Sequence, residues 1–552
     1  MGAKRVYGID LGTTYSCICV VDESGRPQVI QNAEGDFTTP SVVFFEPSGN
    51  VVVGKYAKNS SRLSPDRAVD RMKRYMGDKD FSREVDGRQY RPEELSSFVL
   101  RKLAGDAAQS GDPVEDVVIT CPAYFGAAQR TATENAGRLA GLNVLYVLSE
   151  PTAAAICYGV DKTETDQTVL VFDFGGGTFD VTLIAITQGS IRVVCTDGDD
   201  SLGGVDIDSR IVSYLAEQFI KQCPAAGDPQ DDCQSLQNLA IAAEEVKKRL
   251  SSLEKTAENI SHGGVMARVE FTREELESLI ADLIERTITT TKRALDQGAE
   301  RGHAHVDHVL LVGGSSRMPC VARRLKEALG LETQMFEPDL AVAKGAALMG
   351  LKIRAGELID RALLDMGVSP EAIESGRVDP AVRKDAERKV ATKFGLPAVV
   401  VGQATGRTIM NVCSKGVGVR VVAGPDRTEK IAFLVHANTP VPTKADERFG
   451  TVEANQRSVS VQVYEQAGQV ESEVIEDNKL LAKGEITDLP PNLPSGSPID
   501  VTYELDVSGK LLVGAVEPES GKGLHLEVMV EGAMTEAEVE KSTAELLKRQ
   551  VQ

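Results

Sequence analysis

The stretches Val6-Tyr-Gly-Ile-Asp-Leu-Gly-Thr-Thr14 and Val169-Leu-Val-Phe-Asp-Phe-Gly-Gly-Gly-Thr178 share one local pattern. Each is an apolar run that ends in Asp, turns on glycine and threonine, and returns as a second apolar run, at 15–21 and 179–184. Alternation with a period of two predicts a strand on each side of the turn. Two copies of the same hairpin predict two similar lobes that face one ligand.

Both turns suit a phosphate chain. Glycine leaves the backbone N–H groups open to close approach, and the hydroxyls of Thr13, Thr14 and Thr178 add polar groups. Asp10 and Asp173 could hold a hydrated Mg²⁺ between phosphates. A single glycine turn is usually no more than a hairpin, so it is the matched pair that favours a phosphate site.

A third glycine turn follows the segment 306–312 and reads Gly313-Gly-Ser-Ser-Arg-Met-Pro319. A strand that delivers such a turn to the start of a helix lets backbone N–H groups contact a nucleoside or a phosphate. Any crossover in an α/β domain can use glycine at this point. The third turn therefore supports the site only together with the other two.

The periodicity of the sequence changes along the chain and predicts its organisation. Strand and helix patterns alternate at first, a helical pattern follows, and a period of two then takes over. The apolar segment 396–402 could be a linker or an edge strand, and Thr535-Glu-Ala-Glu538 resembles a helix capping box. The predicted parts are an α/β domain at 1–350, a helical insertion and linker at 351–406, an antiparallel β domain at 407–532 and a short helix at 533–552.

Composition and charge argue against several kinds of partner. The 552 residues include 61 basic and 82 acidic side chains, and the formal net charge of −21 disfavours binding to nucleic acid and to anionic membranes. No apolar run is long enough to span a bilayer, and the first residues lack the pattern of a signal peptide. The nine cysteines form no CxxC pair, which indicates reduced thiols and predicts a cytoplasmic protein.

Four motifs, in this order and spacing, resemble the heat-shock protein 70 family of chaperones: 8–14, 150–155, 173–180 and 311–319. The likeness runs with few gaps from residue 4 to about 349 and resumes in the β domain. It implies an actin-like fold, in which a duplicated ribonuclease-H-like α/β domain hydrolyses ATP. An antiparallel β-sandwich that binds peptides would follow it.

The resemblance also implies site residues. Lys73, Glu150, Asp173 and Thr178 would be catalytic, and Asp10 and Asp173 would hold Mg²⁺ through water. A carboxylate such as Glu150 is a weak base for water, so hydrolysis should be slow and could act as a timer. Lys73 could instead be a surface lysine of a helix at 67–76. Contacts to ATP or ADP would come from Asp10, Gly12, Thr13, Thr14, Gly175, Gly176, Gly177, Gly203, Gly204, Glu244, Lys247, Lys248, Ser251, Gly313, Gly314, Ser315, Arg317 and Asp339.

Further roles follow from the same resemblance. Pro122 and Arg130 match the family's proline relay toward the β domain, although Pro122 could equally be a strand-end proline. In the β domain, Val422 and Val452 would arch over a bound peptide. The pocket beneath them would draw on a set of residues that could also be plain sandwich core, namely Val419, Phe449, Val459 and Val461.

Three departures from the family pattern leave the function open. Residues 352–405 intervene where the family has a short linker, Lys415 and Gly416 replace residues that usually read Leu and Ser, and one short helix stands where the family has a long lid. The leading prediction is an ATP-dependent chaperone for unfolded polypeptide segments, with J-domain and nucleotide-exchange partners. The alternatives are a nucleotide-switched scaffold for one specific partner and a small-molecule kinase of the same superfamily.

Overall fold

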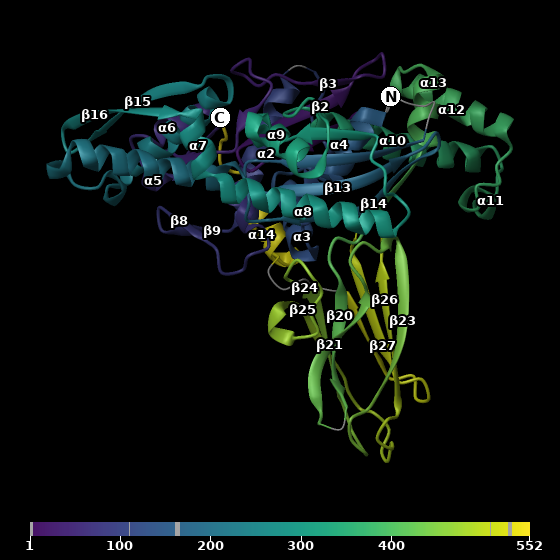
Figure 1. The fold of residues 1–552 in the computed structure, drawn as a ribbon. Coiled ribbons are helices and arrows are strands. Elements are labelled where there is room, and N and C mark those ends of the chain that lie inside the picture. The colour runs from purple at the N-terminus through teal and green to yellow at the C-terminus, as the bar shows by residue number, and fades with distance from the viewer. Residues whose placement is uncertain (1–3, 110, 160–165, 425, 508, 528–532) are drawn as a thin grey trace.

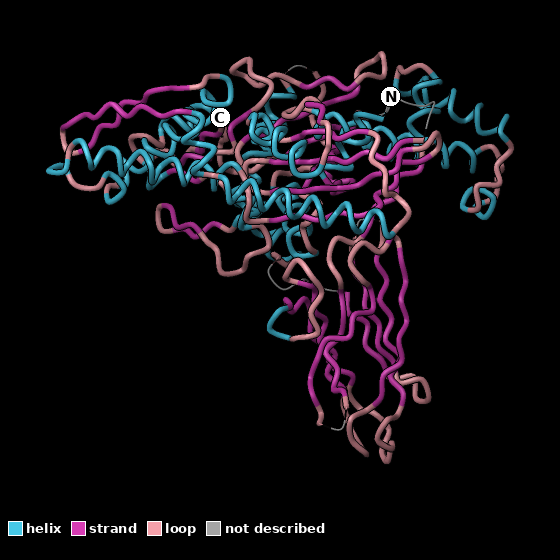
Figure 2. The backbone as a smooth tube through the Cα atoms, viewed as in Figure 1, coloured by secondary structure: helices cyan, strands magenta, loops and turns pink. Residues whose placement is uncertain are grey.

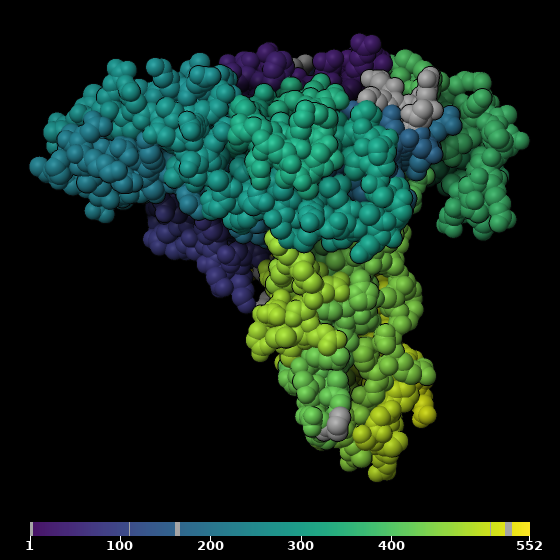
Figure 3. Space-filling model, viewed as in Figure 1, coloured from purple at the N-terminus to yellow at the C-terminus, as the bar shows by residue number. Residues whose placement is uncertain are grey.

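The computed structural model describes residues 4–109, 111–159, 166–424, 426–507, 509–527 and 533–552. An elongated α/β body carries a narrower β domain that projects from it (Figures 1 and 3). Helices are concentrated in the body, whereas strands run along the length of the projecting domain (Figure 2). In the described part of the chain, no helix combines the length and the apolar character needed to cross a bilayer.

The first lobe of the body is built on the sheet that contains the first quoted hairpin. Strands β1 (Val6–Asp10) and β2 (Tyr15–Val21) are antiparallel, and β10 (Asp116–Cys121) runs parallel to β1. The sheet order is β11-β10-β1-β2-β3, with β11 at Asn143–Ser149 and β3 at Pro27–Val29. The turn after β1 therefore lies at one end of this sheet.

The second lobe repeats this arrangement. Strands β12 (Gln167–Phe174) and β13 (Phe179–Ile186) form the second hairpin, and β17 (His308–Val312) runs parallel to β12. Strand β14 (Ser190–Asp199) pairs with β13 on the other side. Both lobes thus have an antiparallel hairpin beside a parallel strand, and the predicted duplication of the hairpin is confirmed.

Helix α10 (Ala341–Asp365) packs against both lobes, through β1 in the first and α4 (Glu150–Gly159) at the junction. The approach to β1 is so close that a Cβ at Gly8 would overlap the backbone of Ala347. Glycine at this position is therefore required by packing as well as by the motif.

The helical insertion forms a small layer at one end of the body (Figure 1). Helix α10 continues into it, and α11 (Pro370–Glu374), α12 (Pro380–Phe394) and α13 (Ala398–Gly406) follow. The Asp379 carboxylate accepts a hydrogen bond from the Ala381 N–H at 2.7 Å and caps α12. The interpretation of 396–402 as linker or edge strand is wrong, because α13 buries Val401 against α10 and α12.

One strand joins the body to the β domain. Strand β19 (Thr408–Val412) pairs in parallel with β14 and antiparallel with β22 (Pro440–Val441) of the β domain. The second-lobe sheet therefore has seven strands, in the order β18-β17-β12-β13-β14-β19-β22, with β18 at Thr333–Met335. The two parts of the protein share a continuous set of backbone hydrogen bonds.

The β domain consists of two four-stranded antiparallel sheets around one core that includes Val463, Leu481 and Tyr503. Burial alternates along β26 (Pro498–Leu505), as expected for a strand with one face in the core. The strands of the first sheet follow the order β21 (Thr428–Val435), β20 (Val417–Ala423), β24 (Val459–Gln466) and β25 (Asn478–Ile486). The strands of the second sheet follow the order β23 (Thr443–Gly450), β26 (Pro498–Leu505), β27 (Leu511–Val516) and β28 (Gly523–Glu527).

The last helix, α14 (Glu536–Leu546), begins with the predicted capping box, in which Thr535 and Glu538 bond to each other's backbone N–H groups. It packs on the first lobe, where Val539 and Leu546 join the hydrophobic core. Val551 then forms a parallel bridge with Val51 of β6 (Val51–Val53). The segment predicted as a residual lid is thus bound to the first lobe of the body.

The remaining elements cover the lobes or form short hairpins. The helices are α1 (Lys55–Ser60), α2 (Pro92–Ala108), α3 (Ala127–Leu139), α5 (Gly204–Gln222), α6 (Cys233–Ser252), α7 (Arg273–Leu279), α8 (Ala281–Glu300) and α9 (Pro319–Leu329). The strands are β4 (Thr39–Pro40), β5 (Val43–Phe45), β7 (Ala68–Val69), β8 (Arg83–Val85), β9 (Arg88–Tyr90), β15 (Lys255–His262) and β16 (Val265–Thr272).

Candidate functional site

A cavity of about 460 Å³ lies between the two lobes, and all three glycine turns contribute to its wall. Most of the polar residues singled out in the sequence meet there. These are Asp10, Gly12, Thr13, Thr14, Lys73, Glu150, Asp173, Gly175, Gly176, Thr178, Glu244, Lys247, Lys248, Gly313, Gly314, Ser315, Arg317 and Asp339. Ser251 lines an adjoining cavity of about 320 Å³ together with Lys247, Lys248 and Arg317.

The first two turns and the segment Gly203-Gly204 approach one another too closely for side chains. A Cβ at Gly176 would overlap Thr14 Oγ1, one at Gly177 would overlap Thr13 Oγ1, and one at Gly203 would lie 2.6 Å from the Gly176 carbonyl oxygen. Gly204 donates its backbone N–H to the Gly175 carbonyl at 3.0 Å. The glycines therefore bring backbone from both lobes into one cradle.

The third turn is tied to the second. Ser315 donates its hydroxyl to the Gly175 carbonyl oxygen at 2.8 Å. Gly313 has a positive φ of 79°, and a Cβ there would lie 2.5 Å from Asp173 Oδ1. The turn after β17 is thus fixed against the end of β12, as the parallel pairing of these strands requires.

Lys73 lies in a buried group that includes the carboxylates of Asp10, Glu150 and Asp173. Its Nζ lies 2.5 Å from Glu150 Oε1, and both side chains are buried. The alternative of a surface lysine on a helix at 67–76 is wrong, because Lys73 is 5% exposed and lies on a 3₁₀ turn at Met72–Tyr75. A left-handed residue, Arg71, precedes that turn and directs it inward.

The carboxylates of this group outnumber its cation. Burial, together with the charge of Glu150, raises the pKa of Asp10 to about 7, and the same two causes raise the pKa of Asp173 well above its ordinary value. Burial opposes the charged form of Lys73, but Glu150 and Asp10 raise its pKa. A divalent cation would balance the excess negative charge, so these residues fit a Mg²⁺ ion held near Asp10 and Asp173.

A second ionic cluster links the two lobes at the wall of the cleft. Glu244 on α6 of the second lobe bonds to Lys58 on α1 of the first, and Lys248 Nζ lies 2.7 Å from the same carboxylate. Tyr15 donates its hydroxyl to Glu244 Oε1 at 2.9 Å, with Lys58 and Lys248 over its ring at 5.4 and 5.1 Å. Although burial opposes ionisation, Lys58 and Lys248 lower the pKa of Glu244 to about 2. The cluster therefore links the lobes by charge.

Sequence reasoning missed Tyr15 and Lys58 as members of this cluster. Tyr15 directly follows the first phosphate turn, so its position was a usable signal. Lys58 lies 186 residues from its partner Glu244, and nothing local in the sequence connects the two. Arg74 was also missed, although it is adjacent to Lys73.

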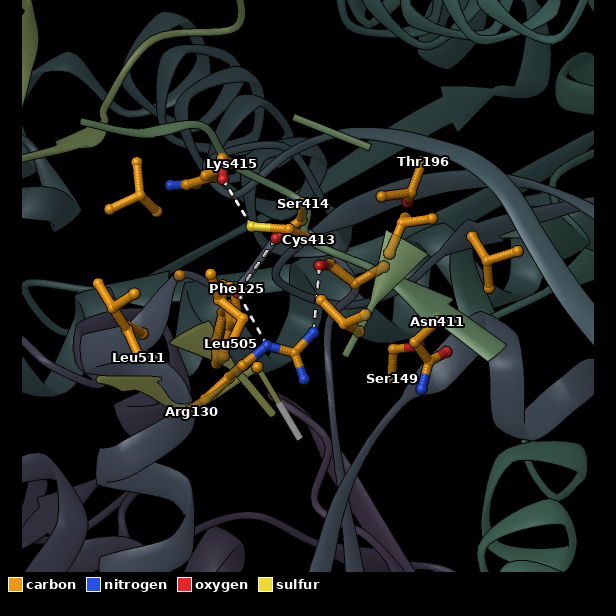
Figure 4. Close-up of a pocket in the computed structure, with 18 of the residues that line it drawn as sticks. Phe125, Arg130, Ser149, Thr196, Asn411, Cys413, Ser414, Lys415, Leu505 and Leu511 are labelled. Atoms are coloured by element: carbon orange, nitrogen blue, oxygen red, sulfur yellow. Dashed lines mark hydrogen bonds between the residues drawn. The ribbon is translucent and has the colours of Figure 1, made fainter. Parts of the chain in front are cut away.

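The proposed relay residues lie where the body meets the β domain. Arg130 donates from Nε to the Phe125 carbonyl at 3.1 Å, and the Pro122 carbonyl accepts the Phe125 N–H at 3.2 Å. Ser414 of the β domain donates to the same Phe125 carbonyl at 3.4 Å. A small cavity of about 50 Å³ adjoins these bonds and is lined by Phe125, Arg130, Cys413 and Ser414, among other residues (Figure 4).

Other contacts fix the docking of the β domain. Glu465 Oε1 accepts the Ala127 N–H at 2.9 Å, at the N-terminus of α3. The Lys415 ammonium lies 4.8 Å from the centre of the Tyr124 ring, and Tyr124 donates its hydroxyl to the Gly468 carbonyl at 2.9 Å. Lys415, a departure from the family pattern, is therefore buried in the junction between the two parts.

The predicted peptide-pocket residues separate into two groups. Val419 and Val461 are buried in the sandwich core, with Phe449 and Val459 half-buried beside them. The predicted arch residues, Val422 and Val452, are each 39% exposed. Arg427 and Glu453 form an ion pair at 3.1 Å between the loops that follow β20 and β23.

Two duplicated lobes that close on a polar cleft, joined to a β-sandwich, define a nucleotide-binding protein with an appended β domain. The family model described as Hsp70 protein matches residues 6–376 and 397–552, which is nearly the whole chain. The chain belongs to the Hsp70 family. Its mixed sheets fit an actin-like ATPase domain followed by a β-sandwich, and the segment between the two matched ranges, 377–396, contains α12.

Membership in this family carries general properties. Members of the Hsp70 family are ATPases that bind nucleotide with Mg²⁺, and they act as ATP-dependent chaperones. They generally bind unfolded peptides and co-chaperones.

Proposed function

We propose that this chain binds ATP with Mg²⁺ in the cleft between its lobes and hydrolyses it slowly. The observation that carries the proposal is the convergence of three glycine turns, Lys73 and three carboxylates on one cavity of about 460 Å³. Phosphoryl transfer needs mainly positioning and charge neutralisation, and these groups supply both.

The side chains of the cleft would have different roles in ATP hydrolysis. Lys73, held by Glu150, would neutralise charge on the transferred phosphoryl group, and Thr13, Thr14 and Thr178 would contact phosphate oxygens. Glu150 would orient the attacking water, with its position fixed by the Lys73 ammonium at 2.5 Å. A bound Mg²⁺ near Asp10 and Asp173 would supply further charge neutralisation.

The far side of the cleft would hold the nucleoside. Glu244, Lys247, Lys248 and Ser251 lie on α6, opposite the turn that carries Gly314, Ser315 and Arg317. Arg317 pairs with Asp339, and Lys247 donates to the Gly204 carbonyl at 3.0 Å. Adenine and ribose would bind between these two walls.

The β domain would bind extended apolar segments of unfolded polypeptides, and slow ATP hydrolysis would time its change from weaker to tighter binding. The exposed Val422, near the end of β20, and Val452, in the loop after β23, supply apolar surface for such a segment. Because Lys415 and Glu465 connect this domain to the body, a change in the cleft could reach the loops through α3. A J-domain protein and a nucleotide-exchange factor would set the rate of the cycle.

One observation favours a second candidate, a nucleotide-switched scaffold for a specific partner. Val419 and Val461 are committed to the sandwich core, and α14 is bound to the first lobe, where it cannot also cover a peptide on the β domain. Without such a cover a bound peptide would dissociate quickly. A β domain without such a cover suits a protein partner that binds over a wider area of its surface.

Peptide binding distinguishes the two candidates. The chain has no Trp, so a fluorescently labelled apolar heptapeptide would be titrated with the protein, and its anisotropy measured with ATP and then with ADP. The chaperone proposal expects saturable binding that several unrelated apolar peptides displace and that is weaker in ATP. Absence of binding, or binding that does not depend on the nucleotide, would favour the scaffold.

A further inference from the structure

Arg74 and Lys73 are neighbours on the 3₁₀ turn Met72–Tyr75, and their side chains contact different groups. Lys73 Nζ meets Glu150 at the end of the first-lobe sheet. The Arg74 guanidinium crosses the cleft and bonds to the second lobe. One short turn of the first lobe thus carries the proposed catalytic lysine and a direct link to the opposite lobe.

The Arg74 link is made to the backbone of the proposed phosphate turn. Nε donates to the Gly177 carbonyl at 3.0 Å, and Nη2 donates to the same oxygen at 2.8 Å. Gly177 lies in the turn between β12 and β13, where a Cβ would overlap Thr13 Oγ1 of the first phosphate turn. Arg74 therefore holds the second turn at the place where it meets the first.

The same guanidinium also bonds to Asp206, in the first turn of α5. Nη1 donates to Asp206 Oδ1 at 3.1 Å, and Nη2 bonds to the other carboxylate oxygen. Asp206 Oδ2 in turn accepts the Gly203 N–H at 2.7 Å, in the segment that packs against the second phosphate turn. A planar guanidinium with several fixed donors suits this geometry, whereas a lysine ammonium cannot reproduce it.

We propose that Arg74 is a positioning residue that couples closure of the two lobes to the placement of Lys73. The proposal rests on ATP hydrolysis in the cleft, as proposed above. When the lobes are apart, the Arg74 bonds to Gly177 and Asp206 are broken and the turn that carries Lys73 loses its anchor. When the lobes close, Arg74 fixes Lys73 and the phosphate turn in one arrangement.

The alternative is that Arg74 is only a stabilising ion pair, and Arg67 provides a matched control. Arg67 has the same bonding pattern, with Nε donating to the Phe45 carbonyl at 2.6 Å and two nitrogens bound to Asp86 at 2.9 and 2.6 Å. Its partners all belong to the first lobe, so it makes no link across the cleft.

The test compares R74A, R74K and R67A in the full-length protein by single-turnover ATP hydrolysis, ATP titration calorimetry and thermal unfolding. For R74A we expect a loss of about 10- to 100-fold in the hydrolysis rate, because misplacement of a catalytic group by about 1 Å costs this much. The Kd for ATP should change by a clearly smaller factor than the hydrolysis rate, since Arg74 does not line the cavity. R74K should retain an intermediate rate, and R67A should hydrolyse ATP like the wild type.

A second measurement is independent of turnover. Hydrogen exchange of the peptide that covers 169–178 should become faster in ATP-bound R74A and stay unchanged in R67A. The inference is overturned if R74A and R67A behave alike, or if R74A loses ATP affinity and hydrolysis rate by the same factor. Wild-type protein that binds ATP without forming ADP would contradict the proposed function, and hydrogen exchange would still decide the role of Arg74.

Discussion

The cleft between the lobes and the predicted peptide pocket of the β domain differ in how firmly the fold fixes them. In the cleft, residues from positions 10 to 339 surround one cavity, and pairs such as Lys73–Glu150 and Arg317–Asp339 fix some of their polar groups. In the β domain, two of the four predicted pocket residues are fully buried in the core and both arch residues are exposed. Buried polar groups must find partners, whereas a valine is equally stable in a core or in a binding pocket.

The largest expected effect is the loss of ATP hydrolysis when the buried cation of the cleft is removed. Lys73→Met keeps most of the length of the side chain but removes its charge, and it leaves the buried carboxylates of Asp10, Glu150 and Asp173 without this cation. Single-turnover hydrolysis should fall by at least about 100-fold, which is typical for loss of a preorganised charge at the transferred group. The rate is measured with radiolabelled ATP, and thermal unfolding shows whether the variant is folded. A wild-type rate in folded K73M would remove Lys73 from the mechanism.

The glycine cradle offers the next test. Gly176→Ala would drive a Cβ into Thr14 Oγ1, so the two phosphate turns must separate and ATP affinity should fall by about tenfold or more. Calorimetric titration with ATP measures the change. Gly189→Ala is the control, because nothing lies within 4 Å of a Cβ at that position. Equal affinities for the two variants would mean that the close approach of the turns does not matter for binding.

The ionic cluster at the wall of the cleft predicts a pH dependence. The folded-state pKa of Glu244, about 2, is below its ordinary value of 4.5, so the ionised carboxylate stabilises the fold above about pH 4.5. This stabilisation is lost as the pH falls from 4.5 toward 2. The difference in Tm between the wild type and E244Q should therefore be largest at pH 6 and should narrow by pH 3.5, without nucleotide. A difference that stays constant over this range would contradict the assigned pairing.

Thiol reactivity tests the junction between the two parts. Burial raises the pKa of the Cys413 thiol to about 12, and Cys413 lies in the small cavity under the β domain, whereas Cys233 is exposed. Iodoacetamide should modify Cys413 at least about tenfold more slowly than Cys233, because only the thiolate reacts. Peptide mass spectrometry over time gives both rates in one sample. Fast modification of Cys413 would mean that the β domain often leaves the body.

The smallest effect concerns the loops of the β domain. The Arg427–Glu453 pair is exposed, so it should contribute less than about 1 kcal/mol. R427A should speed peptide dissociation by no more than about threefold, and less at high salt, as followed by stopped-flow anisotropy. Lys430→Ala is the control, because its partner Glu473 is equally exposed but lies outside these two loops. A larger change in R427A would mean that the pair gates the site.

Local signals in the sequence predicted most of the cleft. The two hairpins and the third glycine turn are short motifs in which the residue type and the local structure agree, whereas Lys73 was predicted only from the resemblance to the Hsp70 family. Tyr15, Lys58 and Arg74 were missed because their partners lie more than 100 residues away.

Two elements outside the cleft show what local patterns leave open. Helix α13 was not predicted, because a nine-residue apolar segment has no clear period, and burial of Val401 against α10 and α12 decides its structure. The sequence predicted α14 from its capping box, but its position on the first lobe depends on long-range packing of Val539 and Leu546.

The most direct test of the account is to mix wild-type protein with a small excess of ATP and Mg²⁺ and to measure bound nucleotide and ADP over time in the same sample. The account predicts one nucleotide bound per chain, followed by slow and complete conversion of that nucleotide to ADP. Absence of saturable ATP binding, or bound ATP that never becomes ADP, would contradict it.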